Sequence, residues 1–206
     1  MSAEECPLKN LSDEELAFKA GKEKNAAAFD ALHKRYRNAI LNYIHRMAGN
    51  MAAAEDITQE VFLSVYEKLE AFETKPKFSS WLYRIATNKA IDLIRKKGRQ
   101  QGTESLDEAV SDKGSEISLI DMLPDNKDRP DLVLRRKEFE EKIQLAIDSL
   151  PERLKTVFIL CYLQGRSHEE VAQILSCRVT SVGVWLMRAR EKFMKKLDLK
   201  SLLTKS

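Results

Sequence analysis

Apolar residues recur at three- and four-residue steps through the first hundred positions of the chain, which is the spacing of amphipathic helices. A short helical pattern follows Ser12, a residue typical of an N-cap, and acidic residues occupy its first turn. Two long patterns follow, from Asn25 to about Gly49 and over about 52–72. A proline-containing loop at 71–80 then leads into a third long helix. We expect the three long helices to pack into a bundle.

The third long helix, at about 77–101, combines an apolar stripe with a basic face. Residues 84–99 carry six basic side chains and one acid, a net charge of +5. Such a surface attracts anions, and the aromatic residues at its entrance, Phe78, Trp81 and Tyr83, are suited to stacking on unpaired bases. The alternative is an ordinary amphipathic helix with a solvated basic end, in which Trp81 belongs to the core.

The middle of the chain has a different composition. Residues 100–131 hold nine acidic and three basic side chains, a net charge of −6, with only short apolar islands. This composition is typical of a flexible linker. We therefore divide the chain into a helical bundle at 1–99, an acidic linker at 100–131 and a second helical domain at 132–206. No stretch alternates as a strand would, so the predicted fold is all-α, with two small helical domains.

The second domain begins with helices predicted at about 132–148 and 151–164, the latter opened by a proline in its first turn. Its last part, 178–206, carries eight basic and two acidic side chains, a net charge of +6. The whole chain has a formal net charge of only +3, so its positive charge is concentrated at particular sites. Such a cluster would contact phosphate and give salt-sensitive affinity.

Two further helices in this domain have the pattern of a helix-turn-helix. Ser167 and Glu170 fit a capping box that opens a short helix. A tight turn at 176–178 separates it from a longer helix, which we expect Thr180 or Ser181 to cap. In a helix-turn-helix the second helix enters the major groove of DNA, and its early residues reach base edges. Helical hairpins also serve as packing or partner-binding elements.

Composition also argues against several other classes of protein. No apolar run approaches the ~20 residues that a membrane-spanning helix needs, and no secretory signal is visible, so we expect a cytoplasmic protein. The cysteines and histidines are scattered and lack metal-ligand spacing, so we expect no metal, no cofactor and no catalysis. They are Cys6, Cys161, Cys177, His33, His45 and His168.

Three stretches, in this order, resemble the extracytoplasmic-function (ECF) sigma factors of the sigma-70 family. Residues 56–62 match Asp-x-x-Gln-Glu-x-Phe, which in the family binds the clamp helices of RNA polymerase. Residues 78–92 resemble the helix that recognises and opens the minus-ten promoter element. Leu150-Pro151-Glu152-Arg153, with Arg188-Ala189-Arg190, resembles the frame of the domain that binds the minus-thirty-five element.

The resemblance implies that the protein directs RNA polymerase to promoters and opens the DNA strands. For polymerase binding it implies Asp56, Gln59, Glu60 and Phe62. For minus-ten DNA, including a base flipped from the melted strand, it implies Phe78, Ser80, Trp81, Arg84, Asn88, Lys89 and Arg95. For duplex DNA at the minus-thirty-five element it implies Arg178, Thr180, Ser181, Gly183, Val184, Trp185 and Arg188. It also implies an anti-sigma factor that clamps both domains.

The start of the last helix departs from the family pattern. Gly183 offers no side chain to a base, and Trp185 stands where the family often has an arginine that contacts phosphate. Two alternatives remain open. A stand-alone helix-turn-helix regulator would bind duplex DNA without polymerase, and a helical interaction module would bind an acidic partner through both basic faces.

Overall fold

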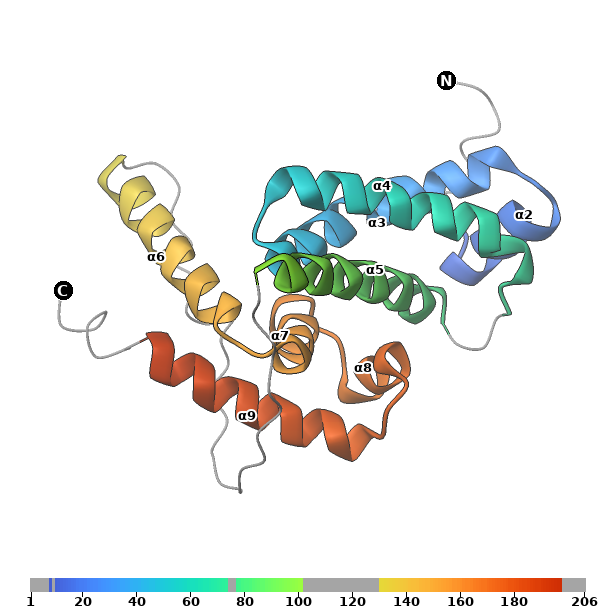
Figure 1. Ribbon diagram of the computed structural model, residues 1–206. Helices are drawn as coiled ribbons and strands as arrows, with labels where there is room; N and C mark the ends of the chain where they lie inside the picture. The colour runs from blue at the N-terminus through green and yellow to red at the C-terminus, as the bar shows by residue number, and fades with distance from the viewer. Residues whose placement is uncertain (1–7, 9, 74–76, 102–129, 198–206) are drawn as a thin grey trace. The chain divides into compact units, whose positions relative to one another are not determined.

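The computed structural model describes residues 8, 10–73, 77–101 and 130–197, and every regular element within these ranges is helical (Figure 1). The predicted all-α fold is confirmed. The chain divides into two compact units. We call the helices up to residue 101 unit 1 and those from residue 130 unit 2, and the division follows these parts except at residues 173–176. Most of the predicted acidic linker lies outside the described residues, so its flexibility and the three-part division stay predictions.

Unit 1 contains helices whose first turns are capped by side chains that the sequence supplies. Its elements are α2 (Asp13–Lys22), α3 (Ala26–Ala48), α4 (Met51–Lys68), the 3₁₀ turn η1 (Leu69–Ala71) and α5 (Phe78–Gln101). The Ser12 hydroxyl accepts a backbone N–H bond at 3.2 Å, and the amide oxygens of Asn25 and Asn50 each accept one at 3.0 Å. Gly49 ends α3 in the left-handed conformation, with φ 67°.

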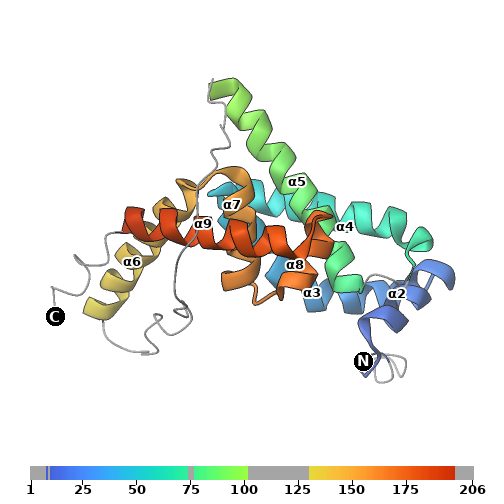
Figure 2. The same ribbon diagram turned by 90° about the horizontal axis from the view of Figure 1, so that it is seen from below.

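Helices α3, α4 and α5 pack against one another and form the predicted bundle (Figures 1 and 2). The apolar stripe of each helix supplies its buried side, with Ile40, Val61 and Leu82 fully buried as examples. Burying such a side chain stabilises the fold by about 1.5–3 kcal/mol. The bundle thus fixes which face of α4 and which face of α5 remain exposed.

Helix α2 also belongs to the bundle, which corrects the expectation of three packed helices. It contacts α3 and η1 and buries Leu16, Ala17 and Ala20. Gly21 makes this approach possible, since a Cβ at that position would lie 2.4 Å from the Leu69 carbonyl oxygen. The contact between α2 and η1 could not be predicted from the sequence, because a single glycine near the end of a helix does not indicate which element packs against it.

Unit 2 contains the predicted helix-turn-helix. Its elements are α6 (Pro130–Asp148), α7 (Glu152–Phe158), the π-helical turn η3 (Ile159–Leu163), α8 (His168–Leu175) and α9 (Val179–Leu197). Helix α9 packs against α6 and α7 and buries Val182, Ala189 and Phe193. The Ser167 hydroxyl accepts the Glu170 N–H at 3.2 Å, and the Glu170 carboxylate accepts the Ser167 N–H at 3.1 Å, so the predicted capping box is confirmed.

Helix α9 begins earlier than predicted. Its first residue is Val179, and the Ser181 N–H donates to the Arg178 carbonyl oxygen at 3.0 Å. Thr180 and Ser181 therefore lie inside the first turn, and the expectation that one of them caps the helix is wrong. The hydroxyl residues misled the prediction because they favour caps, whereas the backbone already turns at Ser176, where φ is 53°.

Candidate functional site

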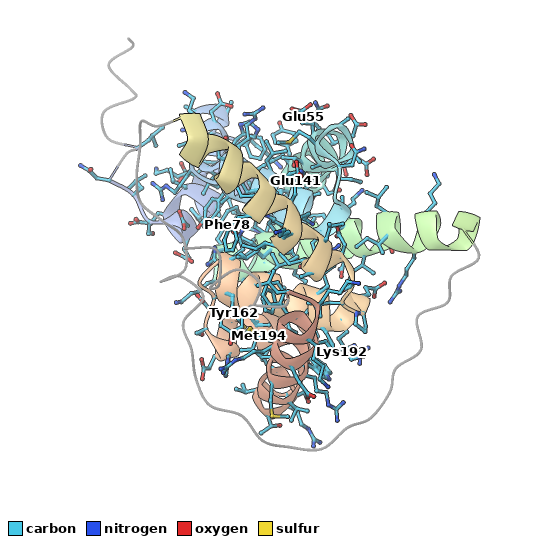
Figure 3. The ribbon with its side chains drawn as sticks, turned by 90° about the vertical axis from the view of Figure 1, so that its left-hand side faces the viewer. Glu55, Phe78, Glu141, Tyr162, Lys192 and Met194 are labelled. Carbon is cyan, nitrogen blue, oxygen red and sulfur yellow. The ribbon has the colours of Figure 1, made fainter. Side chains whose placement is uncertain are left out.

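The outward side of α4 is polar. Asp56, Gln59 and Glu60 are exposed, as is Glu55, which lies at the outer surface of this helix (Figure 3). Phe62 occupies the opposite side, where it is only 5% exposed and its ring meets the edge of His33 with centroids 4.5 Å apart. The three polar residues are therefore available to a partner, whereas Phe62 holds the helix from inside the bundle.

Two apolar side chains on the same outward face were not singled out from the sequence. Leu63 is 59% exposed and Tyr66 is 60% exposed. They follow Gln59 at four- and seven-residue steps, so a helix places them in one row with it. This helical spacing is the signal that could have identified them. We call Asp56, Gln59, Glu60, Leu63 and Tyr66 the α4 face.

Aromatic rings gather where α5 begins. Trp81 is partly buried, and its ring centroid lies 5.0 Å from that of Phe72 and 5.9 Å from that of Phe78. Phe72 and Phe78 meet edge to face at 5.7 Å. Such contacts stabilise the cluster beyond simple burial. Trp81 was expected either to stack on a base or to belong to the core. In the structure part of its ring packs inside the bundle and part remains accessible.

Phe78 and Ser80 lie behind this surface. Phe78 is 0% exposed and Ser80 is 2% exposed, although both were predicted to contact DNA. The Phe78 N–H donates to a Glu14 carboxylate oxygen at 3.1 Å, so α2 supplies an acceptor for the first turn of α5. A direct contact with a base would require these two side chains to be uncovered. Phe78 instead supports Trp81 through the contact between their rings.

Beyond the aromatic cluster, α5 presents polar and basic side chains at helical spacing. Arg84, Asn88 and Arg95 are exposed, whereas Leu82, Ala86 and Ala90 are buried. Lys89 lies between the two sides and its Nζ is 3.0 Å from a carboxylate oxygen of Glu60 on α4. We call Arg84, Asn88, Lys89 and Arg95 the α5 face. Its basic and amide groups match what a nucleic-acid backbone requires.

The start of α9 carries the second set of predicted residues. Arg178, Thr180 and Val184 are exposed, and Ser181, Gly183, Trp185 and Arg188 are partly accessible. Nothing lies within 4 Å of the position that a Cβ on Gly183 would take, so this part of the helix is open. The first two turns of α9 therefore form an accessible surface of the kind that enters a major groove.

Further along α9 the surface is basic. Lys192 is exposed on this helix (Figure 3), and Lys195 pairs with Glu191 at 2.8 Å. The hydrogen bond from Lys195 and its positive charge lower the pKa of the Glu191 carboxyl. The helix has a net positive charge, because its basic residues outnumber this one acid.

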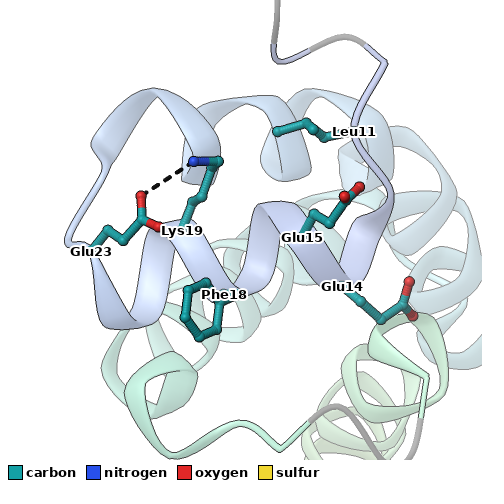
Figure 4. A pocket seen from close by; sticks show the side chains of 6 residues that line it. All are labelled: Leu11, Glu14, Glu15, Phe18, Lys19 and Glu23. Atoms are coloured by element: carbon teal, nitrogen blue, oxygen red, sulfur yellow. Dashed lines mark hydrogen bonds and ion pairs between the residues drawn. The ribbon is translucent and has the colours of Figure 1, made fainter.

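A shallow pocket on α2 has the wrong chemistry for nucleic acid (Figure 4). Its lining consists of Leu11, Glu14, Glu15, Phe18, Lys19 and Glu23, around a volume of about 390 Å³. Three carboxylates on this rim would repel phosphate. Lys19 offsets one of the three charges, because its Nζ is paired with Glu23 at 3.3 Å, so the rim keeps a net negative charge. The pocket is therefore acidic, whereas the surfaces of α5 and α9 are basic.

The described residues lack two other kinds of site. No group of three or more His, Cys, Asp or Glu side chains there could hold a metal ion. Over the same part of the chain, no helix is long and apolar enough to cross a membrane.

An all-α protein with a basic, aromatic-flanked helix in one unit and a helix-turn-helix in the other is, by class, a helical nucleic-acid-binding protein. The family Sigma-70 region 2 matches residues 32–100, and the family Sigma-70, region 4 matches residues 140–193. The first match spans α3 to α5 and the second spans α7 to α9, so both cover the surfaces described above.

Full-length relatives agree with these matches. The chain is 35% identical to the ECF RNA polymerase sigma factor SigW of Bacillus subtilis, over 87% of this chain and 94% of the relative. It is 31% identical to the ECF RNA polymerase sigma-E factor of Haemophilus influenzae, over 91% of this chain and 96% of the relative. The chain belongs to the ECF sigma factors of the sigma-70 family. It is a transcription initiation factor that acts with RNA polymerase on promoter DNA.

Solved structures share the fold. CnrH, determined in complex with the cytosolic domain of CnrY, superposes with a TM-score of 0.66 at 23% identity and covers 91% of this chain and 97% of its own. The sigma factor RpoE of Bartonella quintana, determined with the anti-sigma factor NepR, gives 0.59 at 19% identity over 82% and 96%. These likenesses concern the fold, and the predicted sigma-factor family is confirmed by the sequence matches.

Proposed function

We propose that this sigma factor divides its work among three surfaces: the α4 face binds RNA polymerase, the α5 face holds melted minus-ten DNA, and the start of α9 binds the minus-thirty-five duplex. The proposal needs no covalent chemistry. Contacts that exist only with opened DNA lower the free energy of the melted state, so binding energy drives strand opening. The protein acts where polymerase and DNA are, in the cytoplasm.

The α4 face supports the first assignment through its mixture of charge and apolar area. Asp56, Gln59 and Glu60 offer acceptors to a basic partner, and exposed Leu63 and Tyr66 offer area that association would remove from water. Scattered exposed apolar residues are common, but a row of them beside acids is typical of a helix that binds another protein. The clamp helices of RNA polymerase are the partner that the family implies.

The α5 face supports the second assignment because a partly buried ring precedes a row of donors. Trp81 is held by Phe72 and Phe78, so its accessible edge has a fixed position for an unstacked base. Arg84 and Asn88 follow on exposed positions one turn apart. This succession of ring, cation and amide along one helix is the observation that carries the proposal.

The start of α9 supports the third assignment because its first accessible residues are mostly uncharged and an arginine stands on each side of them. Thr180 and Ser181 offer hydroxyl groups to bases, whereas Arg178 and Arg188 offer charge to phosphate. Gly183 leaves a gap in the row, so part of the sequence preference would come from the shape of the DNA.

Control by an anti-sigma factor is also part of the proposal. The solved sigma factors CnrH and RpoE were determined with other proteins bound, CnrY's cytosolic domain and the anti-sigma factor NepR respectively. The exposed apolar side chains of the α4 face would be a ready target for such an inhibitor, because covering them would exclude polymerase.

The decisive experiment is reconstituted transcription with core RNA polymerase on a promoter library. We expect a defined set of promoters to fire, and we expect Arg84→Gln and Asn88→Ala to reduce strand opening, measured by permanganate reactivity, while core binding is unchanged. Lys34→Gln is the matched control, since Lys34 is an exposed cation that belongs to α3 and not to the α5 face. The proposal fails if no promoter fires, or if the control loses as much opening as the two variants.

A further inference from the structure

Arg153, in the first turn of α7, stacks on a residue of α9. Its guanidinium carbon lies 4.9 Å from the centroid of the Trp185 ring. Arg153 is exposed and Trp185 is partly buried, and the helices that carry them pack against each other within unit 2. The stack therefore holds a positive charge on the flank of the helix that would enter DNA.

The helical positions of α9 place Trp185 at the border of its DNA-facing side. Ser181, Trp185 and Arg188 follow one another at steps of four and three, so they form one row. Val182 and Ala189 lie in the neighbouring row and are fully buried. Trp185 thus joins the core on one side and the accessible row on the other, which explains its partial burial.

Arg153 also lies near the turn of the helix-turn-helix. Partial burial raises the pKa of the Cys177 thiol, and the positive charge of Arg153 acts in the opposite direction. Cys177 stands in the turn that connects α8 to α9. The guanidinium thus lies over Trp185 of α9 and within electrostatic reach of the turn.

Within the described part of the chain, Arg153 forms no ion pair with a carboxylate. Its guanidinium carbon lies over the Trp185 ring, and its N–H groups remain able to donate to an anion. An arginine held in this way has already lost part of its rotamer freedom before any ligand arrives. These are the properties of a pre-positioned anion contact.

We propose that Arg153 contacts a phosphate of the minus-thirty-five duplex and that Trp185 is the positioning residue that holds its guanidinium in place. The inference rests on the proposed function of α9 and adds a residue from outside that helix. When a recognition helix lies in the major groove, the phosphates that border the groove pass along its flanks, where Arg153 stands. Trp185 then contributes to DNA binding through Arg153.

The test uses holoenzyme reconstituted with core polymerase and a promoter that the library experiment identifies. Promoter affinity is measured over a range of salt concentrations for the wild type, Arg153→Gln, Trp185→Ala, Trp185→Phe and the double variant R153Q/W185A. Lys142→Gln is the control, because Lys142 is an exposed cation on α6 in the same unit. Thermal unfolding of each variant shows whether unit 2 remains folded.

We expect Arg153→Gln to weaken binding roughly threefold to tenfold and to reduce the slope of log K against log[salt] by about 1, as loss of one phosphate contact should. Arg153→Gln should weaken binding by the same factor on promoters whose minus-thirty-five bases are altered, because a phosphate contact carries no base preference. Trp185→Phe should keep most of the affinity because it keeps a ring. Trp185→Ala should weaken binding as Arg153→Gln does, and the double variant should lose no more than either single variant.

The inference is overturned if Arg153→Gln keeps the wild-type slope, or if Lys142→Gln reduces it equally. Additive losses in the double variant would also overturn it, since Trp185 would then act on DNA independently of Arg153. Because Arg153 is exposed, its substitution leaves the test valid even where Trp185→Ala unfolds unit 2. Failure of wild-type holoenzyme on every promoter would instead contradict the proposed function, so the two failures are distinguishable.

Discussion

Tyr43 shows how one polar group is accommodated inside the bundle. Its side chain is fully buried, and its hydroxyl lies 2.9 Å from the Thr87 hydroxyl, which donates to the Tyr83 carbonyl oxygen at 2.7 Å. With that donor already directed at Tyr83, the Tyr43 O–H must donate to Thr87. Burial raises the pKa of Tyr43, although the hydrogen bond to Thr87 acts in the opposite direction. This chain of hydrogen bonds ties α3 to α5 and orients the helix that carries the α5 face.

We predict a pH-dependent difference between the wild type and Tyr43→Phe. At neutral pH the substitution should lower the free energy of unfolding by about 1 kcal/mol, because one buried hydrogen bond is lost. Tyr43 keeps its proton in the folded state, whereas the unfolded tyrosine ionises near its ordinary pKa of 10.0. The wild type should therefore lose stability relative to the variant as pH rises above about 10, by up to about 1.4 kcal/mol per pH unit.

Urea unfolding of both proteins between pH 7 and pH 11 checks this expectation. The other tyrosines are common to both proteins, so the difference between the two unfolding free energies isolates Tyr43. A difference that stays constant over the whole range would contradict the burial argument.

At the scale of elements, two glycines inside helices have opposite surroundings. Gly21 of α2 faces the backbone of η1, where a Cβ would lie 2.4 Å from the Leu69 carbonyl oxygen and 2.8 Å from its carbon. Gly183 of α9 faces open space. A glycine in a helix normally costs about 1 kcal/mol relative to alanine, so the same substitution should have opposite signs at the two positions.

We predict that Gly21→Ala destabilises unit 1 by about 1–3 kcal/mol, because α2 must move away from η1. Gly183→Ala should stabilise unit 2 by up to about 1 kcal/mol. Thermal or denaturant unfolding of the full chain, followed by a probe in each unit, measures both values. Stabilisation by Gly21→Ala would show that α2 does not approach η1 as closely as the structure has it.

The elements themselves were largely predictable, because local features determine them. Asn25 and Gly49 fixed the ends of α3, and Ser167 with Glu170 fixed the start of α8. Side-chain exposure was less predictable, since it depends on neighbours distant in sequence. Phe78 has the composition of a base-stacking residue, yet its ring meets Phe72 and Tyr36 inside the bundle.

The candidate site was predictable in its positions but not in its contacts. The exposed residues Arg84 and Asn88 followed from helical spacing, and the family resemblance gave their proposed role. Helical spacing within one helix could not show that Lys89 meets Glu60, or that Arg153 stacks on Trp185, because each pair joins different helices. Such contacts require the tertiary arrangement.

At the scale of the whole molecule, protein binding and DNA binding are assigned to different helices. The variant Leu63→Ser should therefore weaken binding to core polymerase with little loss of thermal stability, because this side chain is already 59% exposed. Leu145→Ser is the matched control, since Leu145 is 65% exposed on α6 in unit 2. Titration of labelled sigma factor with core enzyme measures the affinities, and an equal loss in the control would contradict a specific role for the α4 face.

The contact between Lys89 and Glu60 gives the two faces of unit 1 a thermodynamic link. A partner that binds the Glu60 carboxylate leaves the Lys89 ammonium without its ion-pair partner. DNA that binds Lys89 would likewise free the Glu60 carboxylate. By reciprocity, each ligand changes the affinity for the other by one common factor. An exposed ion pair is worth at most about 1 kcal/mol, so this factor is limited to roughly fivefold. If the α4 face binds polymerase and the α5 face binds DNA as proposed, the two ligands would share a small, salt-sensitive cooperativity.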